Sequence, residues 1–142
     1  MLIAVIGENC TGKSTLAEAL ANKNGAEIMT GKDYLRLAKS ESMAAMLFKK
    51  KLKEAVTGEN LIWIVAEKDL LKMLPEGSVR VLVTAELSVI KERFRERMHG
   101  SLPAPVEKML EAKHGCFDNI ECEFRFRSGE DDVGEFCGRV IN

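Results

Sequence analysis

Gly7-Glu8-Asn9-Cys10-Thr11-Gly12-Lys13-Ser14 stands near the start of the chain, between two contrasting segments. The preceding run, Leu2-Ile3-Ala4-Val5-Ile6, is apolar without a break, which is typical of a strand buried on both faces. The apolar residues that follow recur at helical spacing and end before Asn24-Gly25, a common helix stop: Leu16, Ala17, Leu20 and Ala21. The quoted stretch is therefore predicted to form the turn from a strand into a helix.

This stretch has the pattern of a Walker A phosphate loop, with two glycines and a Lys-Ser pair directly after the second. The backbone N–H groups of such a loop point inward around phosphate oxygens, and the helix N-terminus adds a partial positive charge. We expect Lys13 to reach the β- and γ-phosphates of a nucleotide and Ser14 to offer its hydroxyl to Mg²⁺. The predicted nucleotide-binding residues of the loop are Gly7, Glu8, Asn9, Cys10, Thr11, Gly12, Lys13, Ser14 and Thr15.

The composition of the chain limits the kinds of partner it can have. Its 142 residues suit one domain with a substantial core. The 21 lysines and arginines nearly balance the 22 acidic residues, so no overall field favours nucleic acid or an anionic membrane. No apolar run approaches the length of a membrane span or a signal peptide, and we expect a cytoplasmic protein. Any anion binding must therefore be local.

The rest of the chain alternates between predicted strands and helices. Further strands are predicted at residues 26–29, 61–66, 79–84 and 121–127. Helical segments are predicted at residues 68–74, 86–98, 106–113 and 131–140, with two more between Gly31 and Gly58. Strands joined by helical crossovers imply a parallel sheet covered on both faces, with ligands at the carboxyl ends of the strands. We therefore expect one α/β domain over residues 1–142, built on a five-stranded parallel sheet.

A second motif follows the second predicted strand. Thr30-Gly31-Lys32-Asp33-Tyr34-Leu35-Arg36 resembles the acceptor-binding segment of nucleoside monophosphate kinases, particularly adenylate and cytidylate kinases, in which an arginine follows a Thr-Gly pair. Val81-Leu82-Val83-Thr84-Ala85, followed by an arginine-bearing helix, looks like their fourth strand and the start of their lid. Phe117-Asp118-Asn119 is similar to the residues before their last strand. The resemblance covers almost the full chain, in the right order.

The resemblance implies ATP- and Mg-dependent phosphoryl transfer, with a nucleoside monophosphate as the acceptor. It also implies the three-layer P-loop NTPase fold with strand order 2-3-1-4-5, a small acceptor-binding insertion at about 31–59 and a short lid at about 93–115. Phosphoryl transfer passes through a loose transition state whose negative charge is spread over the moving group. Positioning and positive charge therefore matter more than a strong base, and no histidine or carboxylate dyad stands out in the sequence.

The resemblance also implies a set of acceptor-binding residues. Arg36 would hold the acceptor phosphate with its planar guanidinium, and Thr30 and Gly31 precede it. Asp33, one turn before Arg36, would orient an acceptor hydroxyl or a Mg²⁺-bound water. Lys68 stands where cytidylate kinases tend to carry an arginine, and it keeps the charge but loses the planar fork. For Arg36 and Asp33 the alternative is an ordinary role on a helix surface.

Positive charge for the transition state is expected from the helix at residues 86–98. Arg93 and Arg97, four residues apart, share one flank of its apolar stripe, whereas Arg95 points to the opposite side. We therefore predict that Arg93 and Arg97 act in catalysis together with Lys13, and that Arg95 lies in solvent. The alternative is a charged helix surface on which neighbouring glutamates pair with these arginines.

Arg127 lies between the last predicted strand and the last predicted helix, where the resembling kinases hold the adenine of the donor. An arginine at this position would stack on the base. Glu123, Arg125 and Arg127 alternate on one strand face, which fits a solvated sheet edge equally well. Both interpretations of Arg127 stay open at this point.

The chain departs from the family pattern on the acceptor side. Cytidylate kinases tend to carry Gly-Arg-Asp after the third strand, where this chain reads Glu67-Lys68-Asp69, and the lid has few basic residues. Glu67 lies where a Walker B acid is often found. Three hypotheses follow, of which a nucleoside monophosphate kinase leads. The second is a small-metabolite kinase resembling shikimate and gluconate kinases, and the third is a nucleotide-binding regulatory module with little catalysis.

Overall fold

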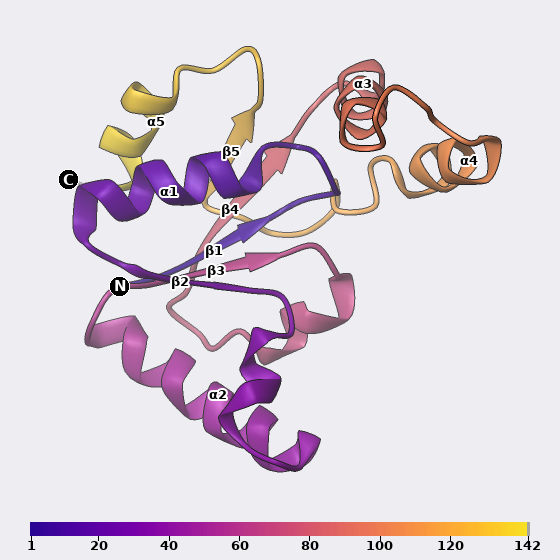
Figure 1. Ribbon diagram of the computed structural model, residues 1–142. Helices are drawn as coiled ribbons and strands as arrows, with labels where there is room; N and C mark the ends of the chain where they lie inside the picture. The colour runs from indigo at the N-terminus through magenta and orange to yellow at the C-terminus, as the bar shows by residue number, and fades with distance from the viewer. Residues whose placement is uncertain (142) are drawn as a thin grey trace.

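The computed structural model describes residues 1–141, and these form a central sheet between two layers of helices (Figure 1). The sheet has five strands, and every pairing between neighbours is parallel, in the order β2-β3-β1-β4-β5. The strands are β1 (Leu2–Ile6), β2 (Glu27–Thr30), β3 (Leu61–Val65), β4 (Val79–Thr84) and β5 (Phe124–Arg127). This confirms the predicted sheet and its strand order.

The central strand β1 ends at the phosphate loop. It pairs with β3 on one side, where Ile6 lies opposite Val65, and with β4 on the other, where Ile6 lies opposite Leu82. The pairing continues one residue into the loop, because the Gly7 N–H donates to the Val65 carbonyl at 3.1 Å. The carboxyl ends of β1, β3 and β4 therefore meet around the loop, at the edge where ligands of parallel sheets bind.

The helices cover the sheet unevenly (Figure 1). On one face lie α1 (Lys13–Asn24) and α5 (Val133–Val140), and on the other face lies α2 (Glu41–Thr57). The pair α3 (Leu87–Arg97) and α4 (Ala104–Lys113) stands beyond the carboxyl ends of β1 and β3. Two short 3₁₀ helices, η1 (Asp33–Leu37) and η2 (Lys68–Met73), follow β2 and β3.

Alternation along β1 divides the core into two clusters, because successive side chains of a strand point to opposite faces. Leu2, Ala4 and Ile6 pack in the cluster under α2, which includes Phe48. Ile3 and Val5 pack in the cluster under α1 and α5. A third, small cluster joins Cys10, Ile90 and Leu110, so the phosphate loop shares buried contacts with α3 and α4.

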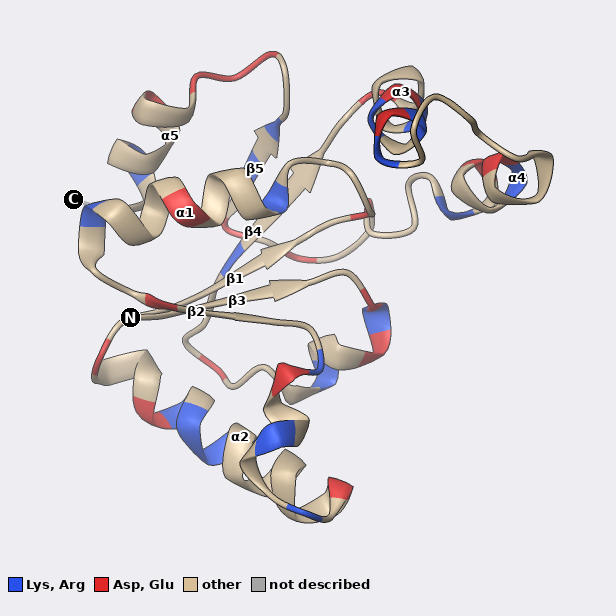
Figure 2. Cartoon of the chain, in the orientation of Figure 1, with Lys and Arg blue, Asp and Glu red and all other residues tan. Residues whose placement is uncertain are grey.

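Charge is distributed in keeping with this layering (Figure 2). The ribbons of β1 and β3 carry no charged residue, while both signs mix on α2 and α3. In residues 1–141 we find no helix that is both long and apolar enough to span a membrane.

Some predicted boundaries were wrong. Residues 33–37 and 68–73 are helical as predicted, and both helices are of the 3₁₀ type. The last strand begins at Phe124 rather than residue 121. The last helix begins at Val133, because the Asp132 side chain accepts from the Glu135 N–H at 2.9 Å and caps it there. Helix α4 begins at Ala104, since Pro105 is tolerated in a first turn, where its missing N–H is not needed.

Candidate active site

The phosphate loop joins β1 to α1, and two of its residues have left-handed backbone conformations. Cys10 and Gly12 have φ values of 63° and 97°. A side chain at Gly7 is excluded, because its Cβ would lie 2.5 Å from the Val83 carbonyl oxygen of β4. Within the loop, the Thr11 hydroxyl donates to the Glu8 carbonyl at 2.8 Å. Close packing of the loop against β4 therefore requires glycine at this position.

Helix α1 presents its N-terminus to the loop. It begins at Lys13, and its N-cap Gly12 has no side chain to satisfy the first N–H groups. The first N–H groups of a helix lack partners within the helix, and with the helix dipole they favour an anion. This end of α1 is therefore suited to phosphate oxygens, as the motif predicts.

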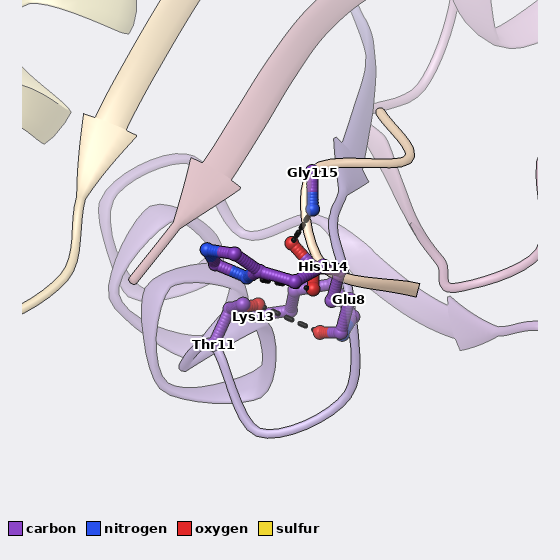
Figure 3. A network of polar contacts seen from close by, with 5 residues as sticks. All are labelled: Glu8, Thr11, Lys13, His114 and Gly115. Carbon is purple, nitrogen blue, oxygen red and sulfur yellow. Dashed lines mark hydrogen bonds and ion pairs between the residues drawn. The ribbon is translucent and has the colours of Figure 1, made fainter. Parts of the chain in front are cut away.

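Lys13 is the one lysine that the fold buries among the described residues. Its Nζ donates to the Glu8 carbonyl across the loop (Figure 3). The pKa of Lys13 is lowered from 10.5 to about 8, mainly because the side chain is buried; Cys10 and Glu8 act to raise it and nearby Arg97 to lower it. A cation in such surroundings gains more from an anionic ligand than an exposed lysine does.

A cavity of about 290 Å³ opens on the β3 side of the loop. Its walls combine the phosphate loop, the end of β2, the end of β3 and one lid residue. The lining residues are Asn9, Cys10, Gly12, Lys13, Ser14, Thr15, Thr30, Gly31, Ile64, Ala66, Glu67, Leu70 and Arg97. We call this the acceptor cavity, because it includes the predicted acceptor residues Thr30 and Gly31.

A larger cavity of about 770 Å³ lies on the β5 side of the loop. Its lining residues come from the loop, α1, α3 and the segment between β5 and α5: Cys10, Gly12, Thr15, Leu16, Arg93, Glu96, Arg97, Phe126, Ser128, Gly129, Asp131 and Val133. We call this the donor cavity. Arg97 lines both cavities, as do Cys10, Gly12 and Thr15, so the two cavities adjoin at the phosphate loop.

The three arginines of α3 have different surroundings. Arg93 donates to the Cys10 carbonyl and to the Ser128 hydroxyl, both at 3.0 Å, and so bridges the phosphate loop and the segment after β5. Arg95 pairs with Glu92 at 2.6 Å on the outer side of the helix. Arg97 makes no ion pair within residues 1–141. The helical wheel thus separated Arg95 from the other two, but it did not anticipate that Arg93 is engaged by protein groups.

The residues after α4 are tied to the phosphate loop through Glu8 (Figure 3). The Glu8 carboxylate accepts from the Gly115 N–H at 3.1 Å and contacts His114 Nδ1 at 3.2 Å. The Glu8 side chain is only 12% exposed, so this contact lies largely out of water. Sequence reasoning missed the partnership, because 106 residues separate Glu8 from His114 and no local pattern links them.

The predicted acceptor residues are not all brought together. Thr30 and Gly31 line the acceptor cavity, as does Glu67. Arg36 and Asp33 instead pair with each other at 3.6 Å, and the Arg36 side chain is 82% exposed. Neither of them lines the cavity, and Lys68 on η2 does not line it either.

Arg127 lies apart from the donor cavity. It pairs with Asp131 at 3.1 Å and with Glu130 at 3.7 Å, and its side chain is 65% exposed. It lines a separate cavity of about 660 Å³ beside Glu8 and His114. In the donor cavity the segment after β5 contributes Ser128 and Gly129 in its place.

The residues at the acceptor cavity fit a magnesium ion that is held mainly by a nucleotide. Ser14 is exposed and lines the cavity beside Lys13. No group of three or more His, Cys, Asp or Glu residues in the described part of the chain could cage a metal. Mg²⁺ commonly keeps several waters and binds one or two protein oxygens plus substrate phosphates, so the Ser14 hydroxyl is the ligand that the phosphate loop would offer. Bound there, the ion would neutralise phosphate charge.

Comparison with known proteins shows the fold. No family model and no curated protein matches the chain. The shikimate kinase from Bacteroides thetaiotaomicron superposes with a TM-score of 0.65 at 16% identity, covering 99% of this chain and 96% of that one. A gluconokinase from Sinorhizobium meliloti 1021 gives 0.63 at 15%, covering 98% and 88%. The YorR protein from Bacillus subtilis, in complex with phosphorylated GDP, gives 0.64 at 21%, covering 99% and 94%.

These neighbours share the P-loop kinase architecture with this chain over nearly its whole length. The predicted three-layer α/β fold is therefore confirmed. The neighbours that are named for their substrates act on small metabolites, and a nucleoside monophosphate kinase is not specifically indicated.

Proposed function

We propose that this protein is a phosphotransferase, a small-metabolite kinase that transfers the γ-phosphoryl group of ATP to a hydroxyl of its acceptor. One observation carries the proposal: Arg97 lines both cavities and lies near enough to Lys13 to lower its pKa, and Lys13 lines the acceptor cavity at the N-terminus of α1. The acceptor oxygen would form a bond to the γ-phosphorus as the bond to the β–γ bridging oxygen breaks, and the hydroxyl proton would leave to solvent. ADP and a phosphate monoester are the products.

The geometry supplies what this transfer needs. The moving phosphoryl group carries negative charge that spreads over its equatorial oxygens in the transition state. Lys13, Arg97 and the N–H groups of α1 surround the place that this group would occupy. Fixed positive charge in a partly buried site stabilises such a transition state without solvent reorganisation.

Two observations favour a small metabolite over a nucleoside monophosphate as acceptor. Arg36, the expected grip for the acceptor phosphate, is 82% exposed and pairs with Asp33 outside the cavity. The acceptor cavity, at about 290 Å³, is also less than half the size of the donor cavity, at about 770 Å³. The fold neighbours that act on shikimate and gluconate support the same preference.

The test is a phosphorylation screen with product detection. The protein is incubated with ATP, Mg²⁺ and separate pools of nucleoside monophosphates, sugar acids, sugars and polyols, with Lys13→Ala as the control. We expect ADP and a phosphorylated metabolite by mass spectrometry, both absent with Lys13→Ala. A product from the nucleotide pool alone would restore the nucleoside monophosphate kinase hypothesis. Thermal stabilisation by ATP without any product would instead indicate the regulatory module.

A further inference from the structure

The acceptor cavity divides into two halves of different charge. Lys13 and Arg97 stand on the phosphate side. The opposite half consists of Thr30, Gly31, Ile64, Ala66, Glu67 and Leu70. Among the described residues this half contributes one carboxylate and no lysine or arginine to the cavity wall.

Four charged residues near this half of the cavity form two ion pairs. Lys32 Nζ lies 3.6 Å from the Glu67 carboxylate, with both side chains more than half exposed. Arg36 and Asp33 form the other pair at the same separation. Lys68, beside Glu67, makes no ion pair within residues 1–141, but it does not line the cavity. An acceptor anion in this half would therefore meet the Glu67 carboxylate with no lysine or arginine in the adjoining wall.

The remaining wall provides polar groups that are fixed in place. The Gly31 carbonyl accepts from the buried Trp63 Nε1 at 2.9 Å, and the Gly31 N–H donates to the Ile64 carbonyl at 2.8 Å. These bonds hold the turn after β2 against β3, with the Thr30 side chain exposed at the cavity. Ile64 and Leu70 add apolar surface behind it, so the wall combines hydrogen-bonding groups with an apolar backing.

We infer that the acceptor is an uncharged polyhydroxy compound, of the sugar or polyol class, whose hydroxyls donate to the Glu67 carboxylate while another hydroxyl faces Lys13 and Arg97. This inference rests on the proposed function and narrows it. A carboxylate accepts hydroxyl hydrogen bonds strongly. A second carboxylate or a phosphate in the same place would be repelled by Glu67 and would lose its own hydration without gaining a cation. The acceptor class thus differs from the sugar acids and nucleotides.

The test compares six-carbon acceptors that differ in charge. The protein is assayed with ATP and Mg²⁺ against D-glucitol and D-glucose, their acid D-gluconate and the amine D-glucosamine, with phosphorylated product measured by mass spectrometry. We expect kcat/KM for an uncharged member to exceed that for gluconate and for glucosamine by about tenfold or more. A higher kcat/KM with gluconate or glucosamine would overturn the inference and leave the proposed kinase function standing. A lack of product from every acceptor, including the wider pools, would overturn both.

Variants at the rim of the cavity test whether Glu67 binds the acceptor directly or acts only through its negative charge. Glu67→Gln should lower kcat/KM for the uncharged acceptor about tenfold while leaving the thermal shift with ATP unchanged. Asp69→Asn is the matched control, because Asp69 is an exposed carboxylate on η2 that does not line the cavity. Lys32→Ala should raise the relative rate with glucosamine, since it frees the Glu67 carboxylate for an ammonium group. Equal effects of Glu67→Gln and Asp69→Asn would overturn the inference.

Discussion

The two sides of the phosphate loop are built in different ways. On the side of α3 and α4, long-range contacts hold the loop: Glu8 accepts from Gly115, the Cys10 carbonyl accepts from Arg93, and the Cys10 side chain packs in the apolar cluster of α3 and α4. On the acceptor side, charged residues pair with near neighbours at the surface. Exposed pairs of this kind contribute about 0–1 kcal/mol each. Residues on the donor side therefore also stabilise the fold. On the acceptor side, a few exposed side chains can be substituted without disturbing the fold.

The largest expected effect comes from removing the lysine at the centre of the site. Lys13→Ala should reduce kcat for phosphoryl transfer by about 10²–10³-fold or more, since it removes one fixed cation from the transition state. Lys23→Ala, at the exposed far end of α1, is the control and should leave kcat unchanged. Steady-state ADP release measures both. A loss below tenfold for Lys13→Ala would show that the loop does not act on the transferred group.

The buried charge of Lys13 predicts a pH dependence of stability. Its pKa is about 8 in the folded protein, against 10.5 unfolded, so the folded state binds fewer protons between those values. The penalty for burying the charge is full below pH 8 and disappears as the pH rises to 10.5. Without nucleotide, Lys13→Met should be more stable than the wild type by up to about 3 kcal/mol at pH 7, a gap that closes toward pH 10.5. Denaturant unfolding at several pH values measures it, and a constant gap would contradict the prediction.

Two arginines of α3 should differ in their effect on kcat. Arg97→Ala should lower kcat about 10²-fold, because Arg97 stands where the two cavities meet. Arg95→Ala should stay within twofold, because Arg95 pairs with Glu92 outside both cavities. The two variants remove the same charge from positions two residues apart on one helix. Equal losses would mean that α3 acts only through its overall charge.

The tie between the lid and the phosphate loop should have a smaller effect. Glu8→Ala removes the acceptor for the Gly115 N–H, which we expect to weaken lid closure by about 1 kcal/mol and to raise the donor KM about fivefold. Hydrogen exchange should increase in residues 104–115, and Glu18→Ala on the exposed side of α1 is the control. Unchanged exchange in α4 would show that the contact does not hold the lid.

The smallest effect is expected on the acceptor side. Arg36→Ala should change kcat/KM by no more than about twofold, because its guanidinium pairs with Asp33 in solvent. A tenfold loss with a nucleotide acceptor would mean that Arg36 turns into the site, and it would bring back the nucleoside monophosphate kinase hypothesis.

The fold was largely predictable from local signals. Two unbroken apolar runs, now β1 and β3, have the composition of strands buried on both faces, and the Gly-Lys-Ser pattern fixes the turn between β1 and α1. The direction of the Arg36 side chain could not be predicted from local sequence patterns. A 3₁₀ helix places residues three apart directly above one another, so Asp33 and Arg36 face each other instead of the site. A sequence does not distinguish that helix type from an α-helix in so short a segment.

The contact between Glu8 and the residues after α4 was not predicted, for another reason. It depends on how α3 and α4 fold back over the loop, and no sequence pattern near Glu8 indicates that arrangement. Glu67 is an intermediate case. Its position after β3 marked it as a candidate acid, but its pairing with Lys32 comes only from the proximity of the β2 and β3 ends.

Trp63 has a practical consequence of its own. It is the sole tryptophan of the chain, fully buried on β3, and its indole N–H donates to the Gly31 carbonyl at the acceptor cavity. Its fluorescence should therefore respond to changes in the turn at Gly31. Fluorescence titration can follow occupancy of the acceptor side in the unmodified chain, without a label and without turnover.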